Sequence, residues 1–478
     1  MDAAPHPGDW RLAEGDVNTS PERRNWQVRN LDRDADALVA EDARLFMSQS
    51  LSSPCLAAVA KAEGIWLEDT TGRRYMDFHG NNVHHVGYGH PRLVAAVKRQ
   101  IDALPFSPRR FANPVATALA RKLTAIAPKG LDKVLFTTGG SDAIDVAIKY
   151  ARAFTGRHKT LSFWDAFHGA GFGGASVGGE AIFRSGKIGP LLPGASHVAP
   201  FACYRCPYGY PVGADGAPDL ALCRMACANM VKYVLEKEGD VAAVIAEPIR
   251  AVPYVPPPDF WGQVRAACDA HGALLIFDEI PLGLGKTGRM FVAEHFGVAP
   301  DILVLGKALG GGMLPIAAML ARADLDVAGT QAFGHYTHEK NPVAAAAALA
   351  TIEIIEDEGL VDNAAAMGAY ALEILHDMKA RRRLIGDVRG KGLAIGIELV
   401  SDRDAKTPAN EAADRVLYRA LTRGLNFKLT MGNVIALSPP LIVTRDEMAR
   451  ALAILDSCLA DEEESTGVAS STPPWLNF

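Results

Sequence analysis

Long apolar runs are missing from this sequence. No stretch reaches the roughly 18 consecutive apolar residues that a membrane-spanning helix needs. The longest candidate, Val343 to Ile355, is rich in alanine and interrupted by Glu353. The first residues, MDAAPHPGDWRLAEGD, have no apolar stretch behind a basic start. We therefore expect neither a membrane protein nor a secretory signal.

An excess of positive charge and a disulfide-like density of cysteine are also missing. The 478 residues carry a net charge of −6 with both signs mixed, which argues against nucleic acid as a partner. The 7 cysteines are too few for a disulfide scaffold, so the cytoplasm is the expected location. Cys203, Cys206, Cys223 and Cys227 have a spacing compatible with zinc. Packed thiols show such spacing too, and we expect no metal site.

Short strand-like runs alternate with helical segments through most of the chain. The runs KVLFTT, KTLSFW, AAVIAEPI, ALLIFDEI and DILVLGKAL are rich in branched apolar residues, and GLAIGIELV follows in a later α/β segment. This alternation predicts an α/β fold with a mostly parallel sheet covered on both faces. The expected parts are an N-terminal arm with part of a small domain (1–90), a large domain (91–342, with a cysteine-containing insertion at about 200–228), the rest of the small domain (343–465) and a tail (466–478).

Small or aromatic residues follow two of these strands, where open α/β sheets bind ligands. Gly140 and Ser141 come after KVLFTT, and backbone N–H groups at such a helix start can hold an anion. Ser141 could equally be an ordinary N-cap. Phe167, after KTLSFW, suits stacking on a flat ring, but most such residues belong to the core.

Ionisable residues follow two further strands. Asp278 comes directly after the apolar run ALLIF, and a buried carboxylate there needs a cationic partner such as a protonated pyridine nitrogen. A helix cap or an ion pair is the alternative. Lys307 follows DILVLG, and a buried lysine must lose its charge, pair it or become an imine.

The order of these motifs resembles the class III aminotransferases, which are pyridoxal-phosphate (PLP) enzymes of fold type I, over nearly the whole chain. The resemblance implies a large domain with a mostly parallel sheet and a smaller α/β domain built from both chain ends. The matching text is YMDF…GYGHP at 75–91, TTGGSDAIDVAIKYAR at 137–152, FHG at 167–169, EP at 247–248, FDEIPLGLGKTGR at 277–289, DILVLGKALGGGMLP at 301–315, THEKNP at 337–342 and RGKGLAIGIEL at 389–399.

The resemblance also implies roles for individual residues. Lys307 would hold PLP as a Schiff base and then move a proton, while Asp278 would pair with the pyridinium nitrogen. Thr337 would reach the phosphate of the neighbouring subunit in a homodimer with shared active sites. The other implied contacts are Gly140 and Ser141 to the phosphate, Phe167 stacked on the ring, the adjacent His168 to the cofactor, and Glu247 beside the substrate amine.

Three departures from the common family pattern bear on the reaction. Ala436 stands where many relatives have an arginine that clamps a substrate carboxylate. Pro281 replaces a glutamine that usually lies near the ring oxygen. The segment 79–87, HGNNVHHVG, is polar where many relatives are small and apolar.

The polar segment, together with SPRRF at 107–111, resembles a subgroup of the family that contains the amino-alcohol phosphate phospho-lyases and the (R)-1-hydroxy-2-aminoethylphosphonate ammonia-lyases. The implied reaction eliminates ammonia and gives phosphonoacetaldehyde. Lys307 would act as the base, and a histidine or Lys307 itself would protonate the departing oxygen. Asn81, His84, Arg109 and Arg110 would bind the phosphonate, unless one arginine serves an ion pair at the dimer interface.

Three other functions stay open at this point. The main alternative is an ω-aminotransferase that moves an amino group between an amine or ω-amino acid and a keto acid. A racemase or epimerase is also compatible with the motifs. A non-catalytic binding protein is disfavoured because Lys307, Asp278 and Thr337 are all retained.

Overall fold

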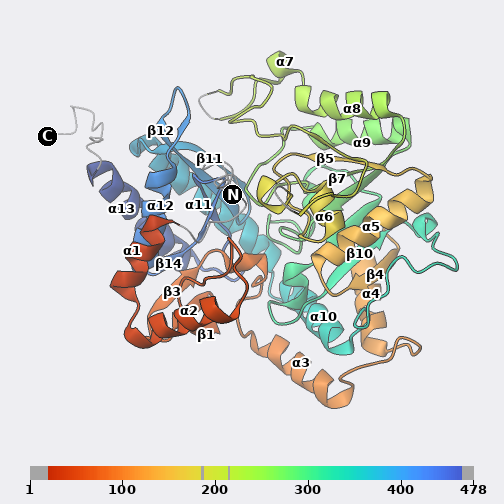
Figure 1. The fold of residues 1–478 in the computed structure, drawn as a ribbon, viewed down its shortest axis with the longest axis horizontal. Coiled ribbons are helices and arrows are strands. Elements are labelled where there is room, and N and C mark those ends of the chain that lie inside the picture. The colour runs from red at the N-terminus through yellow and green to blue at the C-terminus, as the bar shows by residue number, and fades with distance from the viewer. Residues whose placement is uncertain (1–19, 185–187, 214–215, 466–478) are drawn as a thin grey trace, which may run out of the picture. The chain divides into compact units, whose positions relative to one another are not determined.

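The computed structural model describes residues 20–184, 188–213 and 216–465 (Figure 1). It divides into two compact units, a larger one of residues 81–362 and a smaller one of residues 1–80 with 363–478. These boundaries differ from the predicted 90 and 342, because the buried, alanine-rich helix α10 (Pro342–Asp357) packs on α3 (Pro91–Ala103) and α4 (Pro114–Ile126) inside the larger unit. The start of the predicted arm and the predicted tail lie outside the described residues.

A seven-stranded sheet forms the centre of the larger unit, in the order β4-β10-β9-β8-β7-β5-β6. Strands β5 to β9 pair in parallel, whereas β10 runs antiparallel to β9 and β4. The predicted α/β fold with a mostly parallel sheet is thereby confirmed. The strands are β4 (Lys133–Thr137), β5 (Lys159–Phe163), β6 (Ala195–Val198), β7 (Val241–Ala246), β8 (Leu274–Asp278), β9 (Ile302–Leu305) and β10 (Ala317–Ala321).

Helix α5 (Gly140–Thr155) carries the start of the site. It follows β4 and packs along β7, β9 and β10. Its residues Ala143 and Ala147 are fully buried in one apolar cluster with Ile245 and Val304 of the sheet, so its N-terminus is held at the end of β4. The other helices of this unit are α6 (Phe172–Val177), α7 (Leu220–Cys223), α8 (Ala226–Glu238) and α9 (Phe260–His271).

The smaller unit joins both ends of the chain, as predicted. Strand β14 pairs in parallel with β3, which places Leu425 opposite Met76. Its sheets have the orders β1-β2-β3-β14 and β11-β12-β16-β15, and β13 pairs with β12. Its elements are α1 (Pro21–Asn30), α2 (Arg33–Leu45), β1 (Val59–Glu63), β2 (Trp66–Asp69), β3 (Arg74–Asp77), α11 (Leu360–Arg381), β11 (Ile385–Lys391), β12 (Ala394–Asp402), β13 (Thr407–Pro408), α12 (Asn410–Thr422), β14 (Leu425–Asn426), β15 (Lys428–Thr430), β16 (Val434–Leu437) and α13 (Arg445–Ser465).

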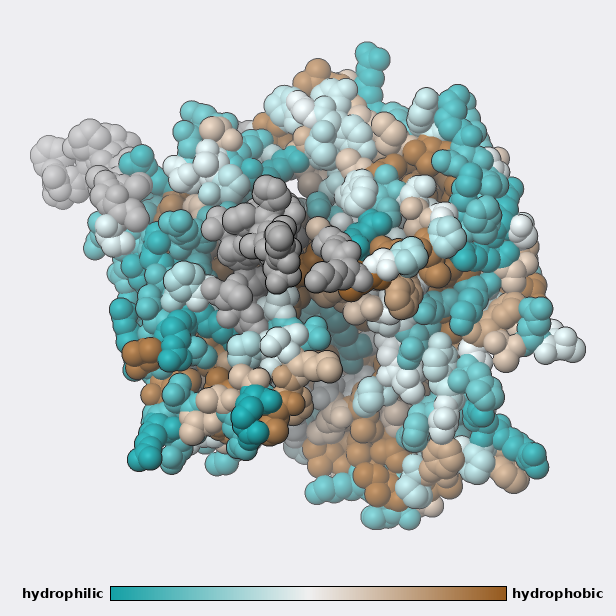
Figure 2. Space-filling model, in the orientation of Figure 1, coloured by the Kyte–Doolittle hydropathy of each residue, from teal (hydrophilic) through white to brown (hydrophobic). Residues whose placement is uncertain are grey.

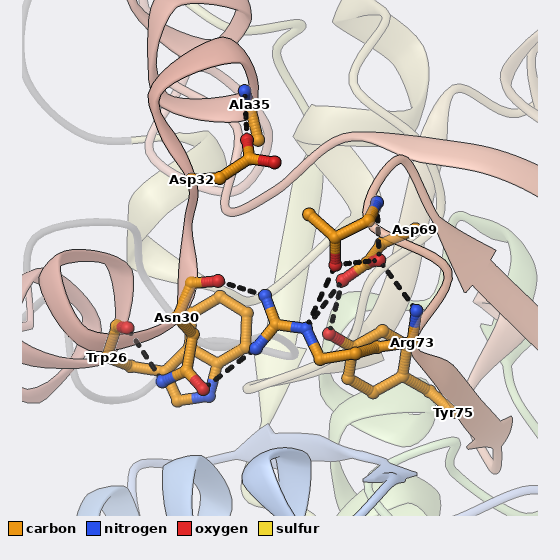
Figure 3. A network of polar contacts seen from close by, with 8 residues as sticks. Trp26, Asn30, Asp32, Ala35, Asp69, Arg73 and Tyr75 are labelled. Atoms are coloured by element: carbon orange, nitrogen blue, oxygen red, sulfur yellow. Dashed lines mark hydrogen bonds and ion pairs between the residues drawn. The ribbon is translucent and has the colours of Figure 1, made fainter.

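Arg73, in the turn between β2 and β3, ties α1 to this hairpin (Figure 3). Its guanidinium donates to Asn30 Oδ1 at 2.9 Å and lies 3.2 Å from Asp69 Oδ2, while Tyr75 donates its hydroxyl to the same Asp69 oxygen at 2.8 Å. The N-terminal helix is therefore an integral part of the smaller unit. None of the described helices is long and apolar enough to span a bilayer.

Candidate active site

Three ionisable residues lie at one edge of the larger unit's sheet. Glu247 follows β7, Asp278 ends β8, and Lys307 follows β9 after a single glycine. The parallel registers of β7 with β8 and of β8 with β9 place these strand ends side by side. The side chains expected to handle the amine and the cofactor thus come from adjacent strands.

Lys307 has a strained backbone and faces a cavity. Its φ is 43°, in the left-handed region that a residue with a β-carbon rarely adopts. Such strain costs on the order of 1–3 kcal/mol and is concentrated at functional sites. The cavity of about 310 Å³ is lined by Val83, Lys307 and the segments 138–140 and 312–316. It therefore joins Lys307 to the start of α5.

The start of α5 has the features of an anion-binding site. Gly139 is the N-cap residue and no side chain caps the helix, which leaves backbone N–H groups of the first turn for a ligand. Ser141 lies within the first turn, so the ordinary N-cap interpretation of this residue is wrong. A β-carbon on Gly140 would lie 2.8 Å from Ile280 Cδ1, and one on Gly169 would lie 2.3 Å from Ser141 Oγ. Glycine is therefore required at position 169, where the backbone of Ser141 also stands in the way, whereas at position 140 the contact is with the flexible end of the Ile280 side chain.

Asp278 is buried and has two hydrogen-bonding partners. It is 2% exposed, its Oδ1 accepts the N–H of Ile280 at 3.0 Å, and its Oδ2 lies 2.8 Å from His168 Nδ1. His168 Nε2 lies 3.5 Å from Ser162 Oγ, at the outer limit for a hydrogen bond. Within the described part of the chain no lysine or arginine pairs with this carboxylate, so a cationic ligand atom would complete its environment.

His168 is therefore expected to act through Asp278 and not by direct contact with the cofactor. His168→Leu removes the N–H donor and should weaken PLP binding and lower turnover about 10- to 100-fold, the range seen when outer hydrogen-bond partners of metal ligands are removed. His168→Asn keeps a donor near the Nδ1 position and should recover most of both. Absorbance titration with PLP and steady-state kinetics measure the two effects.

A matched control is available in His197, a half-buried histidine whose Nε2 lies 2.8 Å from the carbonyl oxygen of Gly178. His197→Leu should leave the PLP affinity unchanged. An equal loss of affinity in the His197 and His168 variants would show that the effect is a general loss of packing.

Phe167 packs against a neighbouring aromatic ring. It is half-buried, and its ring centroid lies 4.5 Å from that of Phe183 with the planes tilted by 47°. Phe183 thus buttresses the residue that is expected to stack on the cofactor. The sequence pattern did not identify Phe183, because nothing local to it indicates this contact.

Glu247 belongs to a buried ion-pair triad. Its Oε1 accepts from Arg250 Nε at 3.2 Å and its Oε2 accepts the N–H of Ala251 at 2.9 Å. A terminal nitrogen of the same guanidinium donates to Glu180 Oε1 at 3.1 Å, and the three charged residues are each 2% exposed. Both oxygens of Glu247 therefore already accept hydrogen bonds within the protein. A contact between Glu247 and a substrate amine would have to form in addition to these bonds.

The polar segment 79–87 begins with an uncommon backbone turn. Gly80, Asn81 and Asn82 have φ values of 47°, 46° and 59°, so three consecutive residues are left-handed. Glycine and asparagine tolerate this conformation best. The turn leads directly to Val83 in the cavity wall and to His84, which is 0% exposed, whereas Asn81 is exposed.

His85 is a neutral, buried histidine near Lys307. Burial lowers its pKa well below 6.5, and the nearby Lys286, His84 and Lys307 lower it further. The hydrogen bond from Nε2 to the carbonyl oxygen of Gly283, at 3.1 Å, identifies Nε2 as the protonated nitrogen. Nδ1 is buried and has no hydrogen-bond partner in the described structure. His85 can thus accept a proton or hydrogen bond, but it has no spare N–H to donate.

This environment predicts a pH dependence of stability. The folded state lowers the pKa of His85 below the unfolded value of 6.5. The stability that the neutral side chain contributes is therefore fully present above pH 6.5, and it is lost as the pH falls below 6.5 toward the folded-state pKa. The free energy of unfolding should fall by up to about 1.4 kcal/mol per pH unit from this residue. His85→Gln keeps a donor for Gly283 and cannot be protonated, so its urea midpoint should depend less on pH between 7.5 and 5. Equal slopes in the two proteins would contradict this assignment.

Of the predicted site residues in the described chain, Gly140 and Lys307 line this cavity and the others do not. Arg109 and Arg110 are exposed in the loop between α3 and α4, and Thr337 is exposed between β10 and α10. Ala436 lies in β16 of the smaller unit and is buried in its sheet.

The four cysteines of the insertion, Cys203, Cys206, Cys223 and Cys227, are all half-buried. Burial raises the pKa of the Cys227 thiol to about 11. Among the residues that the structure describes, no group of three or more His, Cys, Asp or Glu side chains is placed to hold a metal ion.

The site's geometry fits pyridoxal phosphate. The uncapped start of α5 suits the phosphate, and Lys307 adjoins the cavity. Among the described residues Asp278 has no lysine or arginine partner, so its carboxylate suits a pyridinium nitrogen. When bound, PLP withdraws electrons from the carbon that carries the substrate amine.

Comparison with known proteins agrees with this fit. Residues 47–459 match the family Aminotransferase class-III. The chain is 45% identical over 455 residues to the (R)-1-hydroxy-2-aminoethylphosphonate ammonia-lyase of Vibrio splendidus, covering 94% of this chain and 95% of that protein. It is 38% identical to the leucine/methionine racemase of Thermococcus litoralis, covering 90% and 96%.

A related protein of known structure contains PLP. It is a PLP-bound amine transaminase from an uncultivated Pseudomonas species, which is 32% identical with a TM-score of 0.79, covering 87% of this chain and 97% of that one. Together with the match over most of the chain, this identifies the cofactor as pyridoxal 5'-phosphate. The chain belongs to the class III aminotransferases, a family of PLP-dependent enzymes.

Proposed function

We propose that this chain is a PLP-dependent ammonia-lyase acting on a hydroxy-aminoalkylphosphonate such as (R)-1-hydroxy-2-aminoethylphosphonate. The observation that carries the proposal is the position of the polar segment beside Lys307, where Val83 lines the cavity and His85 lies within electrostatic range of the lysine. The 45% identity to an ammonia-lyase of this specificity supports it.

The proposed roles follow from the contacts in the larger unit. Lys307 removes a proton from the carbon that carries the amine, and the neighbouring carbon then loses its hydroxyl as water. The released enamine takes up water and yields phosphonoacetaldehyde and ammonia, so the atoms balance. Because His85 Nε2–H is already donated to Gly283 and its pKa is lowered, Lys307 is favoured over His85 as the donor of the proton to the departing oxygen.

A second candidate is an ω-aminotransferase, because a solved relative of the same fold is an amine transaminase. A transaminase needs an amino acceptor, whereas the lyase does not. Arg250 is paired with Glu180 and Glu247 in a buried triad. We therefore do not expect it to bind the carboxylate of an amino acceptor.

The deciding experiment compares two substrates with and without a keto acid. The PLP-loaded protein should release ammonia and phosphonoacetaldehyde from 1-hydroxy-2-aminoethylphosphonate alone. The matched control is 2-aminoethylphosphonate, which lacks the hydroxyl and cannot undergo the elimination. Amine transfer from either compound only after pyruvate or 2-oxoglutarate is added would replace the lyase by the transaminase.

A further inference from the structure

His85 joins the polar segment to the loop that follows Asp278. Its Nε2–H donates to the carbonyl oxygen of Gly283 at 3.1 Å, across 198 positions in the sequence. The side chain is 1% exposed, so solvent cannot replace this bond. Gly283 is itself tightly packed, since a β-carbon there would lie 2.9 Å from Leu305 Cδ2. Because Leu305 ends β9 two positions before Lys307, His85 is bonded to backbone that lies against the strand leading to Lys307.

Ile280, in the same loop, contacts three parts of the site. Its N–H donates to Asp278 Oδ1 at 3.0 Å. A β-carbon on Gly140, at the start of α5, would lie 2.8 Å from Ile280 Cδ1, and one on Gly306 would lie 3.3 Å from Ile280 Cγ2. Gly306 is the residue before Lys307. A shift of this loop would therefore move the acid, the start of α5 and the lysine relative to one another.

The polar segment also reaches the backbone on the other side of Lys307. The turn after this residue contains Gly311 and Gly312, with φ values of 65° and 73°. A β-carbon on Gly312 would lie 3.3 Å from the carbonyl oxygen of Val83, and one on Gly311 would lie 2.4 Å from Leu93 Cδ2 in α3. The polar segment and the helix that follows it thus lie close to the chain after Lys307 as well as before it.

Apolar packing is the other force that holds this region together. Helices α3 and α10 pack on each other, and Figure 2 shows hydrophobic surface gathered over both of them. Hydrophobic contacts are non-directional, whereas a hydrogen bond weakens steeply when its donor and acceptor are misaligned. The bond between His85 and Gly283 therefore supplies a directional link that apolar contacts do not provide.

We propose that His85 is a positioning residue for Lys307. Through Gly283 it holds the loop 280–283 against Gly306 and thereby maintains the left-handed backbone of Lys307, whose φ is 43°. Such strain persists only where the surrounding structure over-determines it. The inference rests on the proposed role of Lys307 as cofactor anchor and base, and it applies to the lyase and the transaminase alike. A misplacement of about 1 Å can lower a rate about 100-fold.

Two polar substitutions of His85 test the proposal. His85→Asn places its amide near the Nδ1 position and is too short to reach Gly283, whereas His85→Gln places an N–H donor near the Nε2 position. His85→Asn should lower kcat about 10- to 100-fold, change KM less than about threefold and weaken PLP binding about 10-fold. The visible circular dichroism of bound PLP, which reports how rigidly the ring is held, should also decrease. His85→Gln should restore all four quantities to within about threefold of the wild type.

The control is His295→Asn, which makes the same chemical change in the same connection between β8 and β9. His295 Nε2 lies 3.1 Å from the carbonyl oxygen of Thr287. This variant should leave kcat and the visible dichroism unchanged. An equal effect in His295→Asn and His85→Asn would reveal a general loosening of the connection and would overturn the proposal. Equal impairment of His85→Asn and His85→Gln would also overturn it, as would wild-type behaviour of both.

Two of the measurements separate this outcome from a failure of the proposed function. PLP affinity and visible dichroism are recorded without substrate, so they do not depend on the reaction. kcat is measured in whichever reaction the wild-type protein performs, ammonia release or amine transfer to pyruvate. Far-ultraviolet dichroism checks that each variant is folded. If His85→Asn does not fold, His85→Gln decides alone: wild-type visible dichroism supports the proposal and its loss overturns it.

Discussion

Lys307→Ala is expected to abolish turnover, with a loss of at least about 10³-fold, because the variant removes the proposed base together with the covalent anchor of the cofactor. The loss should appear equally in ammonia release and in amine transfer, so it does not depend on the choice of reaction. Borohydride reduction of the wild-type protein should fix the cofactor to the peptide that contains Lys307, and the variant should show no such adduct by mass spectrometry.

The control for this prediction is Lys133→Ala, which changes a lysine with a 58% exposed side chain in β4 of the same sheet. It should retain wild-type turnover and the borohydride adduct. Residual turnover in Lys307→Ala above a few per cent, once wild-type contamination is excluded by mass spectrometry, would refute the role of Lys307 as base and cofactor anchor.

Arg250→Met is expected to destabilise the larger unit by about 3–5 kcal/mol, the usual cost of removing one partner from a buried ion pair. The side chains of Arg250, Glu180 and Glu247 are 3%, 0% and 1% exposed, so solvent cannot replace the lost guanidinium. Chemical unfolding of the apo-protein, followed by tryptophan fluorescence, measures the effect, because Trp261 is buried in the same unit and bonded to the carbonyl oxygen of Pro248.

A triple variant distinguishes loss of charge pairing from loss of packing. Glu180→Gln and Glu247→Gln, added to Arg250→Met, remove the two carboxylates that the single variant leaves without this partner. Stability should recover in part, since neutral groups are cheaper to bury than unpaired charges. If the triple variant is no more stable than Arg250→Met, packing of the arginine stem and not its charge explains the loss.

The sheet and the strand-end residues could be predicted because they depend on local patterns. Each apolar run ends where its periodicity ends, so Asp278 and Lys307 were assigned to strand ends from their neighbours alone. The start of α5 shows the precision of such patterns: the helix begins at Gly140 with Gly139 as its N-cap residue, so Ser141 is not its cap.

The partners of these residues could not be predicted, because they meet only in the folded chain. Arg250 reaches Glu180, which lies far away in sequence, and no local signal announces that contact. The same holds for His168, whose neighbours in the chain indicate a ring contact while its Nδ1 is bonded to Asp278. The resemblance implies a substrate contact for Arg109, and only the structure shows its hydrogen bond to His335.

The left-handed turn at residues 80–82 limits how this site can be altered or exchanged. A residue other than glycine, asparagine or aspartate at these positions destabilises the folded state by about 1–2 kcal/mol, because of the cost of the left-handed backbone conformation. Substitutions in this polar segment therefore have to preserve its backbone conformation. A stabilised scaffold would be the appropriate starting point for changing the substrate range through this segment.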